Sequence, residues 1–244
     1  MKMSIHIGFD PRPSQFGAFH VARYSVRKTM ALQWPVKALI LKDLRKAGLY
    51  TRPTEYDADG HMIDTLSKRE DYDGRVATEF ANSRFLVPFL APQDDWCVFM
   101  DCDMLVRASM DRLRETLDRS KALYCVQHDY TPKDTVKMDG QLQTNYPRKN
   151  WSSFVYFNPH HPSNKKLTLK DVNSLPGRDL HRFCWLADSE IGRLDESWNW
   201  LPDHSDPDMI PNNVHYTDAL PNLPGHENRP YADEWREALY ECVR

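Results

Sequence analysis

The stretch WCVFMDCD, residues 96–103, decides the fold. Its first five residues form a continuous apolar run of strand length, which is typical of a strand buried on both faces of a sheet. Asp101 then follows the carboxyl end of that strand, and Asp103 comes two residues later. In open α/β sheets, this edge forms the crevice that binds ligands. The stretch therefore predicts an α/β fold with two carboxylates in its ligand crevice.

Strand and helix patterns on both sides of this stretch support the same fold class. Residues 4–9 alternate apolar side chains with smaller or polar ones, and this predicts a first strand that runs into a loop. Ser14 can cap a helix with an apolar face over residues 19–30, and residues 36–41 predict a second strand. This β-α-β order predicts a mostly parallel, twisted central sheet flanked by helices. Later segments predict further helices over 76–90, 110–117 and 232–243, and strands over 122–126 and 153–157.

Length and charge restrict the class of protein. The 244 residues are 41% hydrophobic, which suffices for a sizeable core, and we expect one domain over residues 1–244. Residues 51–75 are polar and without period, so they predict a surface loop or excursion. The 32 basic and 35 acidic residues are interspersed and leave a net charge of -3. No long-range field then favours nucleic acid or an anionic membrane, although contact with nucleic acid stays possible through a local basic groove.

Cysteine usage and hydropathy predict the compartment. The five cysteines form no Cys-x-x-Cys pair, and their odd number favours a reducing cytosol. The N-terminus begins directly with a strand pattern, and no apolar run approaches the ~20 residues of a membrane span. We therefore expect a cytoplasmic protein without a transmembrane segment.

The Asp101-Cys102-Asp103 motif predicts a metal site. Two carboxylates at a strand end are costly to crowd together unless a cation neutralises them, and carboxylate oxygens are the ligands that Mg²⁺ and Mn²⁺ require. One alternative is that one Asp caps the following turn and the other is solvated. Another is a phosphatase of the haloacid dehalogenase type, where the first Asp is a nucleophile and the second a general acid. Such phosphatases usually carry the motif near the N-terminus, with Thr or Val where this chain has Leu105.

The chain resembles the retaining glycosyltransferases of family 8, which have a single-domain GT-A fold. The strongest match is residues 98–106 (VFMDCDMLV), which are similar to the strand, Asp-x-Asp motif and following aliphatic residues of that family. Residues 7–10 (IGFD) resemble its opening strand, whose following loop holds the nucleotide base. Residues 82–85 (NSRF) resemble its Ser-Arg-Phe stretch. The resemblance implies that Phe9, Asp10 and Arg84 contact a nucleotide-sugar donor.

A third metal ligand is implied by the same resemblance. Residues 214–217 (VHYT) resemble the family's His-Tyr-Thr-Gly, in which the His binds the metal, so Asp101, Asp103 and His215 would hold the ion. A nitrogen ligand beside carboxylates favours Mn²⁺ over Mg²⁺. Trp198-Asn199 resembles a Trp-Asn pair of the family, without a role assigned to either residue.

The chain departs from the family after His215. The family continues to a Lys that grips the diphosphate, whereas this chain has Asp218 in place of the Gly and no Lys afterwards. Positive character must then come from another group. The candidates are Arg229, Arg148, Lys149 and the backbone amides near Gly225.

Three carboxylates are candidate catalytic groups. Asp188 and Glu190 stand in a segment that resembles the family's Asp-Gln-Asp before a helix. Carboxylates beside an anomeric carbon stabilise its positive charge, but acidic residues also favour a first helical turn through the helix dipole alone. Asp129, after the predicted strand over 122–127, could meet the donor or acceptor sugar or could belong to an ordinary turn.

The leading hypothesis is a metal-dependent hexosyl- or pentosyltransferase with a nucleotide-sugar donor. The resemblance implies UDP as the nucleotide and retention of the anomeric configuration. The acceptor is a saccharide or another hydroxyl-bearing compound. The alternatives are a metal-dependent phosphohydrolase and a non-catalytic nucleotide- or carbohydrate-binding relative.

Overall fold

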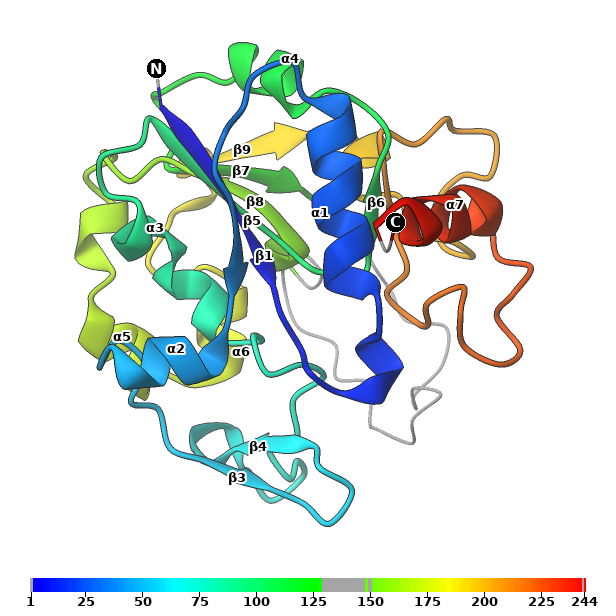
Figure 1. The fold of residues 1–244 in the computed structure, drawn as a ribbon. Coiled ribbons are helices and arrows are strands. Elements are labelled where there is room, and N and C mark those ends of the chain that lie inside the picture. The colour runs from blue at the N-terminus through cyan, green and yellow to red at the C-terminus, as the bar shows by residue number, and fades with distance from the viewer. Residues whose placement is uncertain (1, 129–147, 149–150, 243) are drawn as a thin grey trace.

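The fold is built on a six-stranded sheet with the strand order β2-β1-β5-β8-β7-β9 (Figure 1). The computed structural model describes residues 2–128, 148, 151–242 and 244. Parallel pairs join β1 to β2, β1 to β5 and β7 to β9, while β8 runs antiparallel to both β5 and β7. Five strands of this sheet therefore share one direction, which confirms the predicted mostly parallel sheet. The strands are β1 (Met3–Gly8), β2 (Val36–Leu39), β5 (Trp96–Met100), β7 (Leu123–Val126), β8 (Phe154–Phe157) and β9 (Ile191–Leu194).

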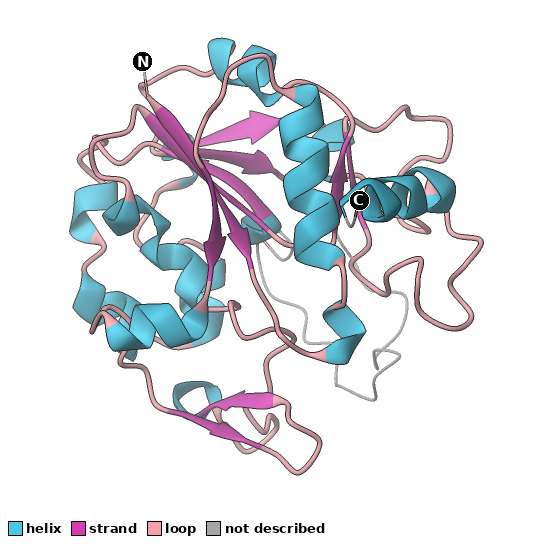
Figure 2. Ribbon diagram, in the orientation of Figure 1, coloured by secondary structure: helices cyan, strands magenta, loops and turns pink. Residues whose placement is uncertain are grey.

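Two small antiparallel ribbons flank this sheet (Figure 2). One pairs β6 (Met104–Val106) with β10 (Asn213–His215), and the other pairs β3 (Thr54–Tyr56) with β4 (Met62–Asp64). The first ribbon continues the chain directly from the Asp-x-Asp motif. It therefore determines what faces that motif.

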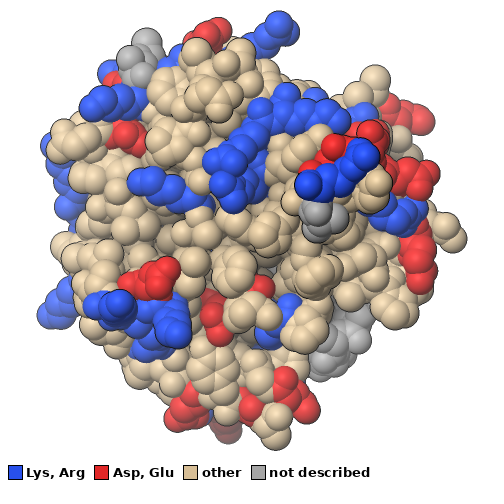
Figure 3. Space-filling view, viewed as in Figure 1, with Lys and Arg blue, Asp and Glu red and all other residues tan. Residues whose placement is uncertain are grey.

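The helices lie in two groups around the sheet (Figure 1). The first helix α1 packs against β6 and α7, whereas α2, α3, α5 and α6 gather at the other side. In Figure 3, Lys and Arg side chains lie over α1, and acidic side chains lie at the lower edge, over the β3–β4 hairpin. The helices are α1 (Ala18–Thr29), α2 (Leu41–Lys46), α3 (Val87–Leu90), α4 (Met110–Glu115), α5 (Leu169–Ser174), α6 (Gly177–His181) and α7 (Ala232–Cys242).

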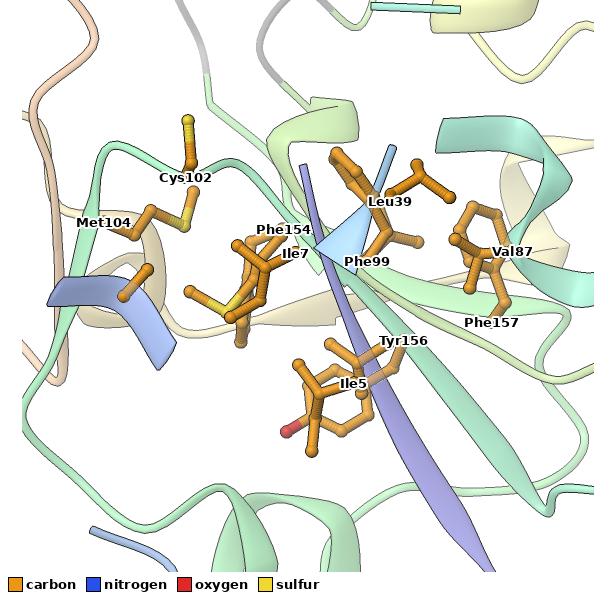
Figure 4. Close-up of a cluster of buried hydrophobic side chains, with 14 of the residues drawn as sticks. Ile5, Ile7, Leu39, Val87, Phe99, Cys102, Met104, Phe154, Tyr156 and Phe157 are labelled. Carbon is orange, nitrogen blue, oxygen red and sulfur yellow. The ribbon is translucent and has the colours of Figure 1, made fainter. Parts of the chain in front are cut away.

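The core is formed mainly by the central strands. Every residue of β5 and of β8 is buried, as their apolar sequences predict. Ile5, Phe99 and Phe157 lie together in this cluster (Figure 4). Full burial of side chains of this size contributes about 1.5–3 kcal/mol each. The sheet is thus a rigid base for the loops at its edges.

Two predicted helix boundaries are wrong. Residues 76–82 are turns, and helical structure begins only at the 3-10 helix Ser83–Leu86 that leads into α3. Pro88 stands in the first turn of α3, where its missing N–H removes no helical hydrogen bond. Ser14 caps no long helix, because α1 begins after Gly17, which has φ of 82° and lies against Leu239 of α7.

Residues 51–75 are also more ordered than predicted. They contain the β3–β4 hairpin and a 3-10 turn at Thr65–Ser67. The sequence pattern did not predict this structure, because the buried Arg52–Asp64 ion pair holds the segment and an apolar stripe does not. The predicted C-terminal helix is confirmed as far as Cys242.

Two further properties concern the thiols and the hydropathy of the helices. All five cysteines are free thiols. Within the described ranges, no helix has both the length and the apolar character that crossing a bilayer requires.

Candidate metal centre

Asp101, Asp103 and His215 form one cluster, which we call the Asp101 cluster. Asp101 follows β5 directly, and Asp103 immediately precedes β6. His215 ends β10, where it pairs with Met104 of β6, and the Tyr216 amide donates to the Asp103 carbonyl at 2.9 Å. The pairing of β6 with β10 thus brings His215 next to the Asp-x-Asp motif, although more than a hundred residues of sequence separate them. The ligand atoms of the three side chains lie within 4.8 Å of one another.

The His215 ring presents one defined nitrogen to the two carboxylates. Its Nε2 lies 3.3 Å from Asp103 Oδ1 and 3.8 Å from Asp101 Oδ2. Its Nδ1 lies 2.8 Å from Asn199 Oδ1, and Asn199 Nδ2 donates to Ser153 Oγ at 2.9 Å. The amide orientation makes Asn199 Oδ1 the acceptor, so Nδ1 carries the proton. In this tautomer Nε2 faces the two carboxylates and is the nitrogen that a metal would bind, and Asn199 is a supporting residue whose role sequence reasoning missed.

Charge in the Asp101 cluster is poorly compensated. Burial raises the pKa of Asp101 to about 6, with Asp103 adding to the rise and Arg84 and His215 opposing it. Burial lowers the pKa of His215, but the carboxylates of Asp103 and Asp101 outweigh it, so the net shift is upward. The buried atoms Asp101 Oδ1 and Asp103 Oδ1 accept no well-directed hydrogen bond from the described residues, and each instead lies beside one nitrogen, Arg84 Nη1 at 3.0 Å and His215 Nε2 at 3.3 Å. Two such oxygens beside an imidazole nitrogen fit a divalent cation.

Arg84 lies against the same carboxylate from another direction. Its Nη1 is 3.0 Å from Asp101 Oδ1 and donates to the Ser152 carbonyl at 2.9 Å. Its Nε donates to the Ala81 carbonyl at 2.8 Å, and its guanidinium lies 4.7 Å from the ring centroid of Phe99. Arg84 was predicted to contact the donor, and the structure places it beside a predicted metal ligand.

Phe9 and Asp10 lie at the carboxyl end of β1, on the same sheet edge as Asp101, because β1 and β5 are parallel. Phe9 packs edge-on against Phe19 with ring centroids 5.7 Å apart. Both oxygens of Asp10 are occupied: Oδ1 accepts from the Arg12 amide and Nε, and Oδ2 accepts from Arg12 Nη2 and the Glu79 amide, at 2.8–3.1 Å. Asp10 therefore fixes Arg12 at this edge and has little remaining capacity to accept from a ligand.

Comparison with known proteins gives one near relative. No family model matches the chain. The chain is 40% identical to Protein CDI of Arabidopsis thaliana over 242 residues, which cover 97% of this chain and 86% of that protein. The chain belongs to the family of Protein CDI.

Solved structures extend the fold comparison for this CDI-family chain. The galactosyltransferase LgtC, in complex with donor and acceptor sugar analogues, aligns with a TM-score of 0.57 and 15% identity over 98% of this chain and 96% of its own. The bifunctional glycosyltransferase WbbM aligns with a TM-score of 0.60 and 14% identity over 99% of this chain. GlyE of Streptococcus pneumoniae aligns with a TM-score of 0.57 and 10% identity over 98% of this chain.

These likenesses confirm the predicted GT-A-type fold. The CDI-family chain spans about half of WbbM (51%) and 60% of GlyE. At such low identity the likeness shows the fold alone, so membership of family 8 stays a prediction.

Glu190 lies away from the Asp101 cluster. It directly precedes β9, beside the amino end of β7, and both strands run in the direction of β5. Asp101 stands at the carboxyl end of β5, so the sheet separates the two carboxylates. Glu190 accepts hydrogen bonds from the Ser163 hydroxyl and from the Ala187 amide at 2.9 Å, and these bonds lower its pKa. The structure therefore gives Glu190 a local capping role at the start of a strand.

Asp188 occupies the same 3-10 turn and is also not brought to the Asp101 cluster by any contact that the structure describes. Its side chain is 88% exposed and pairs with Arg148. In the motif that this segment resembles, a helix follows the acidic residues, whereas here β9 follows. A cavity of about 540 Å³ lies beside the pair and is lined by Arg148, Trp151, Arg182, Cys184, Leu186 and Asp188.

The remaining candidates are Asp129 and the basic groups that could replace the expected Lys. Asp129 and Lys149 lie outside the described residues. Arg229 donates through Nε to His226 Nδ1 at 3.1 Å and pairs with Asp203 at 3.3 Å. Arg148 is held by Asp188 and by the Phe183 carbonyl. The group that replaces the expected Lys is thus not identified by a contact with the Asp101 cluster.

Proposed function

We propose that this CDI-family chain is a metal-dependent glycosyltransferase that moves a sugar from a nucleotide-sugar donor to a hydroxyl-bearing acceptor. The observation that carries the proposal is the Asp101 cluster, in which two carboxylates and one imidazole converge at the ligand edge of a GT-A-type sheet. The phosphohydrolase alternative has the same motif but no corresponding likeness among the aligned structures, which are glycosyltransferases.

The ion would be held by Asp101, Asp103 and His215, with Mn²⁺ preferred over Mg²⁺ because one ligand is an imidazole. When bound, such an ion is a Lewis acid that stabilises the negative charge growing on a leaving diphosphate. Asn199 holds His215 in the tautomer that leaves Nε2 available. Arg84 holds Asp101 in place and adds positive charge beside it.

The nucleoside would lie beside Phe9 at the carboxyl end of β1, because this edge adjoins the end of β5. Asp10 acts there indirectly. It accepts hydrogen bonds from the Arg12 guanidinium and so fixes the orientation of Arg12 at this edge of the sheet. We propose UDP as the nucleotide, a hexose or pentose as the transferred sugar and retention of its configuration, all supported by the resemblance to family 8.

The acceptor is proposed as a saccharide, in line with the acceptor sugar analogue bound to LgtC. We propose that the protein acts in the cytoplasm, a reducing compartment in which its free thiols would persist. We also propose that residues 1–244 form one domain.

Calorimetric melting with UDP, GDP and their sugars, with and without Mn²⁺, tests the proposal. A ligand at a hundred times its dissociation constant stabilises the native state by about 2.7 kcal/mol, so we expect the melting temperature to rise by about 5 to 10 °C with UDP and Mn²⁺ together. A parallel assay follows UDP release from UDP-sugars. Absence of any Mn²⁺-dependent shift with every nucleotide would overturn the proposal, and phosphate release from aryl phosphates would favour the phosphohydrolase.

A further inference from the structure

Arg52 and Asp64 form an ion pair within the polar segment 51–75. Both side chains have 0% exposure, and the pair is bidentate, with Arg52 Nε and Nη2 donating to the two Asp64 oxygens at 2.8 and 2.7 Å. Arg52 Nη1 also donates to the Val172 carbonyl at 3.0 Å. Removing two charges from water costs free energy that their attraction only partly returns, so such a pair is weak support for a stability role. Another role is therefore worth seeking in what Asp64 touches.

Asp64 connects the hairpin to the turn that carries Arg84. Its Oδ2 accepts from Asn82 Nδ2 at 3.2 Å and from the Ser67 hydroxyl, and Ser67 Oγ in turn accepts from the Gly177 amide at 3.1 Å. Asn82 is 1% exposed and immediately precedes the 3-10 helix Ser83–Leu86. One buried carboxylate thus fixes the start of this helix relative to β4 and α6.

Arg84 is sensitive to where that helix begins. Its Nη1 serves both the Ser152 carbonyl and Asp101 Oδ1, at 2.9 and 3.0 Å. Hydrogen bonds lose most of their strength when the distance grows by about 0.6 Å, so a small shift of the helix would break both contacts. The connection runs from Asp64 to Asn82 by a hydrogen bond, from Asn82 to Arg84 along the backbone of the helix, and from Arg84 to Asp101 by an ion pair.

We propose that Arg52 and Asp64 are positioning residues for Arg84, and through it for the carboxylate of Asp101. The positioning of Arg84 does not depend on the proposed function. Its expected effect on the binding of nucleotide and metal does rest on that function. It gives the segment 51–75 a role in the Asp101 cluster although neither residue of the pair touches that cluster.

A charge-free replacement separates positioning from stability. The double variant Arg52→Met with Asp64→Leu removes both charges and keeps apolar packing, a change that is often neutral or stabilising. It also removes the acceptor of Asn82. Asn82→Ala is the milder second variant, because it leaves the ion pair intact and cuts only the link. Asp111→Asn is the matched control, a buried carboxylate that accepts from the Ala31 and Leu32 amides, remote from Arg84 in its contacts.

Isothermal titration of UDP with Mn²⁺ is the first measurement. Loss of a residue that supports a metal ligand weakens binding about 10-fold to 100-fold, and we expect this loss in the double variant and in Asn82→Ala but not in Asp111→Asn. Adding Arg84→Lys to the double variant should then weaken binding little further. Unchanged binding in both link variants, or equal loss in Asp111→Asn, would overturn the inference.

Hydrogen exchange of the amides of residues 82–86 is the second measurement, and it needs no ligand. We expect faster exchange in the double variant and in Asn82→Ala, with unchanged exchange in Asp111→Asn. If wild-type protein fails to bind UDP with Mn²⁺, the proposed function falls while this measurement still decides the positioning role. If binding is normal and exchange is unchanged in both link variants, the positioning role falls alone.

Discussion

Among the residues that the structure describes, two groups of side chains have the composition of a metal site, two Asp and one His, and they differ in their place in the fold and in the partners of their carboxylates. The Asp101 cluster lies at the ligand edge of the central sheet, whereas Asp57, Asp59 and His61, here the Asp57 cluster, lie between β3 and β4. In both groups the ligand atoms are within 4.8 Å of one another. Residue types and proximity alone therefore do not distinguish them.

Satisfaction of the carboxylates does distinguish them. Asp57 Oδ1 accepts from the Asp59 and His61 amides at 3.0 and 2.8 Å, and Oδ2 pairs with Arg75 at 2.8 Å. Desolvation is the largest single influence on Asp57 and raises its pKa, but the backbone hydrogen bonds and the charge of Arg75 together outweigh it, so the net shift of the pKa is downward. The pKa of Asp101 moves in the opposite direction, to about 6. The charge of Asp57 is already stabilised by the protein, while burial and the neighbouring Asp103 outweigh the help that Arg84 gives to the charge of Asp101, so a bound cation would stabilise it further.

The largest expected difference between the two clusters follows from matched Asp→Asn changes. Asp103→Asn should abolish the Mn²⁺-dependent rise in melting temperature and reduce sugar transfer by about 100-fold or more, since it removes one negative ligand. Asp57→Asn should leave both quantities unchanged. Calorimetric melting and UDP release measure the two effects. Equal losses in the two variants would show that the comparison is mistaken.

A smaller effect is expected from the residue that orients His215. Asn199→Ala removes the acceptor of Nδ1, and we expect Mn²⁺ to bind about 10-fold to 100-fold more weakly because the tautomer and the ring direction are no longer fixed. Isothermal titration with Mn²⁺ measures this change. Asp59→Ala in the Asp57 cluster is the control, and an unchanged affinity in Asn199→Ala would count against His215 as a ligand.

The smallest expected effect comes from an attempt to turn the Asp57 cluster into a site. Arg75→Gln removes the ion pair to Asp57 Oδ2 but leaves the two backbone donors on Oδ1. We expect Mn²⁺ to bind there no more tightly than about 1 mM, the weak end of exposed carboxylate sites. Paramagnetic broadening of His61 resonances measures this binding. Micromolar affinity would mean that Arg75 alone separates the two clusters.

The sequence predicted most accurately those elements whose position is determined by a local pattern of apolar residues. The run WCVFM matches β5 residue for residue, and the pattern before Cys242 matches α7, because both elements bury a continuous or periodic apolar surface. Asp101 and Asp103 were found through their position after that strand, and His215 only through its surrounding motif. Their approach depends on the pairing of β6 with β10, which no local signal encodes.

The features that the sequence did not predict depend on contacts between residues that are separated along the chain, or on backbone conformation. Residues 51–75 are ordered by the Arg52–Asp64 pair, and two charged residues separated by eleven others carry no periodic signal. Asp188 and Glu190 matched a motif in composition, but β9 follows them at the end of the sheet opposite Asp101, so their catalytic role stays a prediction. Gly17, and not Ser14, is the N-cap of α1, because its φ of 82° favours a residue without a side chain.

Ser153 connects the two halves of the Asp101 cluster. Its carbonyl accepts from the Asp101 amide at 2.9 Å, and its hydroxyl accepts from Asn199, which holds His215. Ligands from distant parts of the chain are therefore positioned by a single residue, which immediately precedes β8. Preorganisation of this kind means that folding has already met the entropy cost of assembling the ligands, so an arriving ion loses little affinity to rearrangement.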